Sequence, residues 1–159
     1  MRTEKQTSKH LFLAVIVTVF YVMLVMMTIA MKWEPWIIPL ITTGMFSVWF
    51  LHIGRSNSEV LYENLCAGLI LGEFFYFGVH RGIIFDIPAI ACILILIFSM
   101  FDRKRLLYIT AALYVLEMLY HIFILRSIAV NPGMHVLMRL LLGAAVVIGS
   151  TEIARYRIN

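Results

Sequence analysis

The feature that most constrains this chain is a series of apolar segments, each close to the length that crosses a bilayer. A transmembrane helix needs about 20 mostly apolar residues. Six such segments are separated by short polar connections, and they cover about residues 11–31, 36–53, 61–80, 83–101, 106–125 and 134–150. The pattern predicts an all-α, polytopic membrane protein with six transmembrane helices.

The connections between these segments have the composition expected at a membrane surface. Residues 32–36 form a charged and aromatic turn of the kind found at headgroup level. Residues 102–105 give a sharp polar stop, and residues 131–133 form the last turn. Asp86 and Pro88 suit the beginning of the fourth helix, where a capping acid and an early proline are tolerated.

The composition excludes most classes of soluble protein. Hydrophobic residues make up 62 % of the chain and charged residues 14 %, against roughly 45–50 % and about 25 % in soluble domains. A small fold cannot bury that much apolar surface, so a soluble enzyme and a nucleic-acid-binding protein are both excluded. Cys66 and Cys92 lie in apolar segments without a CxxC pattern, which predicts packing residues.

The positive charges predict the orientation of the helices, because cytoplasmic loops carry an excess of Lys and Arg. A cytoplasmic N-terminus places nine of them on one side, namely Arg2, Lys5, Lys9, Arg55, Arg103, Lys104, Arg105, Arg155 and Arg157. The opposite side then holds Lys32, Arg81 and Arg126, and only Arg139 lies within the membrane. We therefore expect both termini in the cytoplasm, with a tail over 1–10, a membrane domain over 11–150 and a cytoplasmic helix beginning at 151–159.

Ionisable residues inside the bilayer are costly, and this chain places several of them in register. They form stripes on three of the predicted helices: Glu73, Tyr76 and His80; Tyr114, Glu117 and His121; and His135 with Arg139. At about 1.5 Å per residue, the acids and Arg139 lie at comparable depths below the outer surface. The stripes predict a polar cluster in the outer half of the bundle, and these eight residues are the candidate ligand-binding residues.

Four interpretations of this cluster stay open. The first is a Glu–Arg–Glu network that fixes helix register, and the second is a pocket for a small extracytoplasmic molecule with Arg139 as an anion clamp. The third is a metal or proton sensor, and the fourth is part of a proton-coupled transporter. The metal candidates are His80, His121, His135 and Asp86, although their spacing matches no metal motif. Two acids against one base leave a charge of about −1 when both are ionised, so a proton or another cation belongs there.

Several polar and small residues outside this cluster have structural interpretations. Glu63 reads as a first-turn acid of the third helix, and His52 as an interfacial anchor beside Trp49. Two pairs of small residues predict close helix packing within the bundle, or alternatively a dimer contact on the sixth helix: Gly68 with Gly72, and Ala145 with Gly149.

The C-terminal segment indicates how the membrane domain is connected to the cytoplasm. Residues 149–159 leave the membrane in a helical pattern, with apolar residues recurring at i and i+4 and with Glu152 and Arg155 as candidate output residues. Together with six helices and very short loops, this segment resembles the N-terminal membrane sensor region of bacterial sensor histidine kinases and, less specifically, of diguanylate cyclases. The resemblance implies a location in the bacterial cell membrane and a catalytic domain beyond Asn159.

The sequence therefore predicts a sensory input domain that detects a ligand, an ion or a membrane state and transmits it through the sixth helix. The expected partners are the lipid bilayer, a second copy of the chain and an extracytoplasmic small molecule or ion, but no nucleic acid. No nucleotide-binding, hydrolase or kinase motif occurs in the chain, and no cofactor is expected. The alternative is a small stand-alone transporter or a partner or scaffold subunit.

Overall fold

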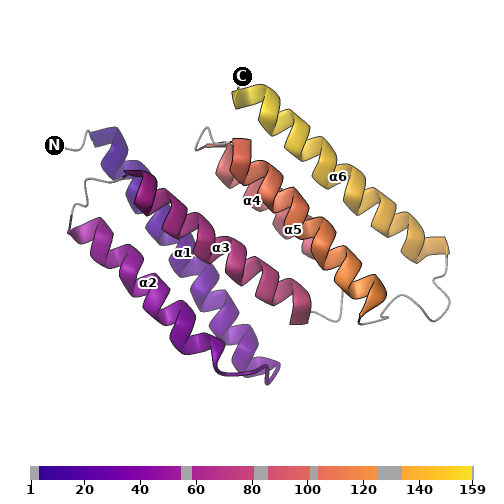
Figure 1. The fold of residues 1–159 in the computed structure, drawn as a ribbon, viewed down its shortest axis with the longest axis horizontal. Helices are drawn as coiled ribbons and strands as arrows, with labels where there is room; N and C mark the ends of the chain where they lie inside the picture. Colours follow the sequence, from indigo (N-terminus) through magenta and orange to yellow (C-terminus); the bar gives the residue numbers. More distant parts are fainter. Residues whose placement is uncertain (1–3, 55–58, 81–85, 101–103, 125–133, 159) are drawn as a thin grey trace. The chain divides into compact units, whose positions relative to one another are not determined.

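The computed structural model consists of α-helices, without a strand, over the residues that it describes: 4–54, 59–80, 86–100, 104–124 and 134–158. The side chains of residues 4–7, 134–137 and 139 lie outside this description. The helices are α1 (Glu4–Ala30), α2 (Ile37–Ile53), α3 (Glu59–His80), α4 (Ile87–Ser99), α5 (Lys104–Phe123) and α6 (Met134–Ile158) (Figure 1). The predicted all-α class is confirmed.

Three of these helices are long and apolar enough to cross a membrane, which supports a membrane location. They are residues Ser8–Ala30 of α1, the whole of α3 and the whole of α5. The apolar helices α2 and α4 have 17 and 13 residues. A helix of 13 residues reaches about 20 Å, whereas the hydrocarbon core is about 30 Å thick. Because α2, α4 and α6 are not among these three helices, the six transmembrane spans stay a prediction.

The chain divides into two compact units, Met1–Phe74 and Phe75–Asn159, and the boundary falls within α3. The first unit contains α1, α2 and most of α3. The second contains the end of α3, at residues 75–80, together with α4, α5 and α6. Each unit is described by itself below.

In the first unit, α1 and α2 lie side by side as an antiparallel hairpin (Figure 1). The end of α1 is closed by two hydrogen bonds, from the Trp33 amide to the Thr28 carbonyl at 3.0 Å and from the Lys32 amide to the Ile29 carbonyl at 3.4 Å. Lys32 has a φ of 55°, in the left-handed region. This is a Schellman motif, in which a lysine occupies the position that glycine usually takes.

Side-chain hydrogen bonds link α1 to α2. The Trp49 indole donates to Thr18 Oγ1 at 2.9 Å, and Thr18 donates its own proton to the Ala14 carbonyl at 2.8 Å. Tyr21 and Thr42 are hydrogen-bonded at 3.0 Å. Such bonds satisfy polar groups locally, and in lipid they help to hold neighbouring helices together.

The beginning of α3 packs against α1 through polar groups. Tyr62 is fully buried, stacks on the His10 ring at 4.2 Å and donates a hydrogen bond to the His10 carbonyl at 2.8 Å. Lys9 lies 2.5 Å from a carboxylate oxygen of Glu63 and 3.6 Å from one of Glu59. The prediction of Glu63 as a first-turn acid is wrong: α3 begins at Glu59, which is the first-turn acid, and Glu63 lies in the second turn and is buried against Lys9.

The predicted packing of Gly68 and Gly72 inside a bundle is not found in the first unit. Both glycines are exposed, and a Cβ built on either of them would meet no atom within 4 Å. By contrast, Cys66 is fully buried, as expected for a packing residue. His52 lies 5.8 Å from the Trp49 ring and 6.5 Å from the Tyr62 ring, measured between ring centroids.

In the second unit, α4 packs against both α5 and α6. It is the most completely buried helix of this unit, because Ile87, Ala91, Leu94, Ile95 and Phe98 are all at most 1 % exposed. Asp86 occupies the N-cap position and Pro88 lies within the first two helical positions, as predicted, but the Asp86 side chain makes no capping hydrogen bond.

The sixth helix runs parallel to α4 and antiparallel to α5. Pro88, near the start of α4, lies against Gly143, and Cys92, one turn further along, accepts a hydrogen bond from Ser150 at 3.5 Å. The close approach at Gly143 depends on the missing side chain, since a Cβ there would lie 2.8 Å from Pro88. Besides the contact between α4 and α6, α5 and α6 pack against each other along a second seam.

Candidate functional site

The polar stripe predicted on α5 faces the interior of the second unit. Tyr114, Glu117 and His121 are at most 2 % exposed, although every one of them carries a polar or ionisable group. Their spacing of three and four residues places them on one face of α5. The three side chains therefore share one buried face of α5, and their role in ligand binding stays a prediction.

His121 closes the end of α3. Its Nε2 lies 2.7 Å from the carbonyl oxygen of Gly78. A carbonyl can only accept a hydrogen bond, so Nε2 carries the proton. Because α3 ends at His80, the Gly78 carbonyl is among the last four of the helix, which have no intrahelical donor. His121 therefore supplies from α5 the donor that α3 lacks.

Glu117 lies one turn from His121 and packs against the same glycine. A Cβ on Gly78 would overlap the Glu117 carboxylate, so the two helices approach at a position where only glycine fits without displacement. Neither carboxylate oxygen has a hydrogen-bond partner among the described residues. Burying an unpaired charge costs several kcal/mol or more, so this position suits a carboxyl group that holds a proton or is paired with a bound cation.

Tyr76 and His80 form a pair on the last turn of α3. Their ring centroids lie 4.1 Å apart, and His80 Nδ1 donates to the Tyr76 carbonyl at 2.9 Å. Tyr76 is buried and His80 is half-buried. Imidazole groups at the C-terminal end of a helix are favoured by the helix dipole when they are protonated. The end of α3 thus receives one histidine from its own last turn and another from α5.

The remaining members of the predicted cluster are placed as follows. Glu73 belongs to the first unit, where it is 3 % exposed and its carboxylate oxygens have no hydrogen-bond partner among the described residues. The side chains of His135 and Arg139 lie outside the described residues, so the anion clamp at Arg139 stays a prediction.

The predicted metal site gains no support in the part of the chain that the structure describes. No group of three or more potential metal ligands occurs among these residues. His121 is engaged with the Gly78 carbonyl and His80 with the Tyr76 carbonyl, and Asp86 is exposed at the start of α4. The fourth candidate, His135, falls outside the described side chains.

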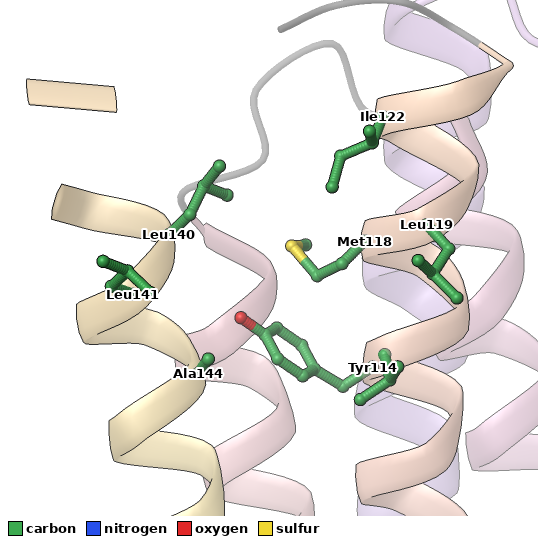
Figure 2. A pocket seen from close by; sticks show the side chains of 8 residues that line it. Tyr114, Met118, Leu119, Ile122, Leu140, Leu141 and Ala144 are labelled. Carbon is green, nitrogen blue, oxygen red and sulfur yellow. The ribbon is translucent and has the colours of Figure 1, made fainter. Parts of the chain in front are cut away.

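A pocket that the sequence did not indicate lies between α5 and α6. Its volume is about 340 Å³, and Figure 2 shows side chains from the two helices facing each other across it. The lining comprises Tyr114, Val115, Met118, Leu119 and Ile122 from α5, and Leu140, Leu141 and Ala144 from α6. Of the described lining residues, only Tyr114 was among the candidate residues. Apolar lining residues look like ordinary lipid-facing ones in a sequence, and the small Gly143–Ala144 step was the only available signal.

The two predicted output residues lie at the far end of α6 from this pocket. Arg155 and Glu152 form an ion pair at 2.7 Å, and both are partly exposed. A hydrogen bond with Tyr108 of α5, and secondly the charge of Glu152, raise the pKa of Arg155. The C-terminal end of α6 is thus tied to the beginning of α5.

Comparisons of the chain with protein-family models, with curated proteins and with solved structures find no match. The resemblance to sensor kinases therefore stays a prediction that rests on the number of apolar segments, the short loops and the C-terminal helix.

Proposed function

We propose that this chain is the membrane-embedded sensory input domain of a bacterial signal-transduction protein, with histidine kinase as the first choice of output. It has six transmembrane helices with both termini in the cytoplasm. Its partners are the bilayer, a second copy of the chain and a small molecule or ion that enters from the outer half of the membrane. The sixth helix transmits the signal.

The observation that carries this proposal is the continuity of α6. The helix runs without a break from Met134 to Ile158. Leu140, Leu141 and Ala144 line the pocket near its beginning, and the Glu152–Arg155 pair lies near its end. From Ala144 to Glu152 the rise is about 12 Å. A change in the pocket therefore acts on the same rigid element that carries the output residues.

The physical requirement is a helix with two arrangements of similar free energy. A ligand shifts such an equilibrium only by the difference between its affinities for the two arrangements. The seam between α5 and α6 provides a place for this difference, because it holds a pocket at one end and the Tyr108–Arg155 hydrogen bond near the other. A shift of α6 along α5 changes both.

A dimer contact on α6 fits the exposed surface of this helix. Ala145 is exposed, and a Cβ on Gly149 would meet no atom within 4 Å. Small residues four positions apart allow two helices to approach closely in a membrane. The proposal places the partner copy against this side of α6.

The test is a fusion of the chain to the dimerisation helix and catalytic core of a histidine kinase, with insertions of one to seven residues after Asn159. If α6 drives the output, autophosphorylation in membranes rises and falls with the number of inserted residues, with a repeat near 3.5 residues or seven. Two inserted alanines continue the helix, whereas two glycines of the same length weaken it, so only the glycine fusion loses the dependence on phase.

A constant output across all insertions would overturn the proposal, provided that every fusion reaches the membrane at similar levels. That result would favour the alternative function, which is a stand-alone transporter or a partner subunit. Flux into vesicles that contain the purified chain would then be the relevant measurement.

A further inference from the structure

The pocket between α5 and α6 has the size of a small-molecule site. Its volume of about 340 Å³ lies near the lower end of the range of ligand pockets, about 300–1,000 Å³. It lies within the second unit and is formed by two helices that face each other along the seam described above (Figure 2).

The lining defines the polarity of the occupant. Seven of the eight lining residues are Val, Met, Leu, Ile or Ala, and the described residues bring no charged side chain to the wall. A charged group in such a pocket would lose its hydration without a compensating partner. The described lining therefore favours an uncharged and mostly apolar occupant.

Among the described lining residues, Tyr114 supplies the one polar feature. Its side chain reaches from α5 across the seam to α6, where the hydroxyl lies against Gly143 and Ala144 at the wall of the pocket (Figure 2). The residue is 2 % exposed, yet its hydroxyl has no hydrogen-bond partner among the described residues. A buried hydroxyl without a partner is unfavourable, and phenylalanine would avoid this cost while filling the same space. A ligand with a hydrogen-bonding group would remove this cost.

The route into the pocket is lateral. Val115, Leu119, Ile122 and Leu141 line the pocket and are exposed at the surface of the helices. α5 is apolar enough to cross a membrane, so these residues face lipid if it does. A molecule dissolved in the bilayer therefore reaches the pocket without crossing water.

We propose that the α5–α6 pocket binds an uncharged, membrane-dissolved molecule that has an apolar body and one hydrogen-bonding group, and that Tyr114 is the residue that recognises this group. This inference rests on the proposed function and deepens it by naming the chemical class of the stimulus. Binding fills the space between α5 and Ala144 of α6, so it acts directly on the transmitting helix.

The experiment uses the full chain in lipid nanodiscs and a photoreactive decanol that carries a diazirine on its alkyl chain. Labelled residues are located by mass spectrometry, and unlabelled 1-decanol and decane serve as competitors. This pair differs in a single hydroxyl group. Labelling is expected at Met118 and neighbouring pocket residues, with 1-decanol displacing the probe roughly three- to tenfold more effectively than decane, which is the fold-change of one net hydrogen bond.

Three variants define the site. Tyr114→Phe keeps the ring and removes the hydroxyl, so it abolishes the preference for 1-decanol over decane. Ala144→Leu fills the pocket and abolishes the labelling. Ala112→Leu, on the exposed side of α5 and outside the lining, makes the same change elsewhere and leaves the labelling intact. Far-UV circular dichroism and melting curves establish that each variant is folded.

Uniform labelling of all lipid-facing residues would overturn the inference, because it would show only the surrounding acyl chains. Equal competition by decane and 1-decanol, unchanged by Tyr114→Phe, would also overturn it, as would a disulfide between two copies of a Leu141→Cys variant that excludes the probe. The assay measures occupancy and not output. Its failure would therefore leave transmission through α6 intact, and a failure of the insertion test would leave the binding result standing.

Discussion

The hydrogen bond between His121 and the Gly78 carbonyl makes a sharp prediction about stability. Both residues are buried, and the donor–acceptor distance is 2.7 Å. His121→Phe keeps an aromatic ring of similar size and removes the donor. The carbonyl then stays buried at the end of α3 without a partner, which costs about 1–3 kcal/mol. For a chain of this length the loss corresponds to a fall in melting temperature of roughly 2–10 °C.

His80 is the matched control. It also donates to a carbonyl in the last turns of α3, that of Tyr76 at 2.9 Å, but it is half-buried. The Tyr76 carbonyl lies four residues before the end of α3 at His80, so it keeps its place in the helical ladder without the side chain. We expect His80→Phe to cost less than about 1 kcal/mol. His121→Gln restores an N–H donor and recovers part of the loss.

Unfolding in mild detergent, followed by circular dichroism during titration with a denaturing detergent, measures these differences. Amide hydrogen exchange adds a local readout, because loss of the cap speeds exchange in residues 75–80 and leaves α1 unchanged. Equal losses for His121→Phe and His80→Phe, together with unaltered exchange at the end of α3, would refute the reasoning.

Three further predictions concern other positions. Gly78→Ala lowers the free energy of unfolding by about 1–3 kcal/mol, because the new Cβ meets a buried carboxylate. Gly72→Ala, with open space around it, changes the free energy of unfolding by less than about 1 kcal/mol. Thermal melts of the two variants test this difference. Lys32→Gly raises stability by about 0.5–1 kcal/mol, because it relieves the left-handed backbone at φ 55°, and an unchanged or lower melting temperature would contradict this. Glu63→Ala costs about 1–2 kcal/mol of unfolding free energy, since the Glu63 carboxylate is buried and lies 2.5 Å from Lys9. Glu59→Ala costs less than about 0.5 kcal/mol, because the contact of Glu59 to Lys9 is longer and partly exposed. Denaturant titrations that rank the two variants in the opposite order would show that burial does not decide the strength of these ion pairs.

Local patterns of the sequence predicted the helices and the residues on one face of α5. The stripe on α5 is an example, because a spacing of three and four residues places Tyr114, Glu117 and His121 on one side of any α-helix, whatever it packs against. These groups lie inside the unit because exposing a polar or ionisable group to lipid costs free energy. The position of Asp86 and Pro88 at the start of α4 was likewise readable, since both residue types favour helix beginnings.

Contacts between distant segments of the chain could not be predicted from the sequence. Lys9 and Glu63 are 54 residues apart in the sequence. Glu63 was interpreted as an acid favoured by the helix dipole, because its partner Lys9 lies on another helix and cannot be recognised from the sequence. The role of His121 could not be inferred either, since its partner is a backbone carbonyl, which every residue has. The pocket between α5 and α6 is formed by residues that are individually typical of a lipid-facing helix.

The sequence by itself determined that this chain forms apolar helices suited to a membrane, because helical hydrogen bonds are local and the thickness of the hydrocarbon core fixes the length of an apolar segment. Only the tertiary structure decided that His121 caps α3, that Glu117 meets Gly78, and that Tyr114 points into a pocket beside α6. These outcomes depend on which side chains interdigitate at each helix seam, and in lipid this depends on shape and on individual hydrogen bonds that no periodicity encodes.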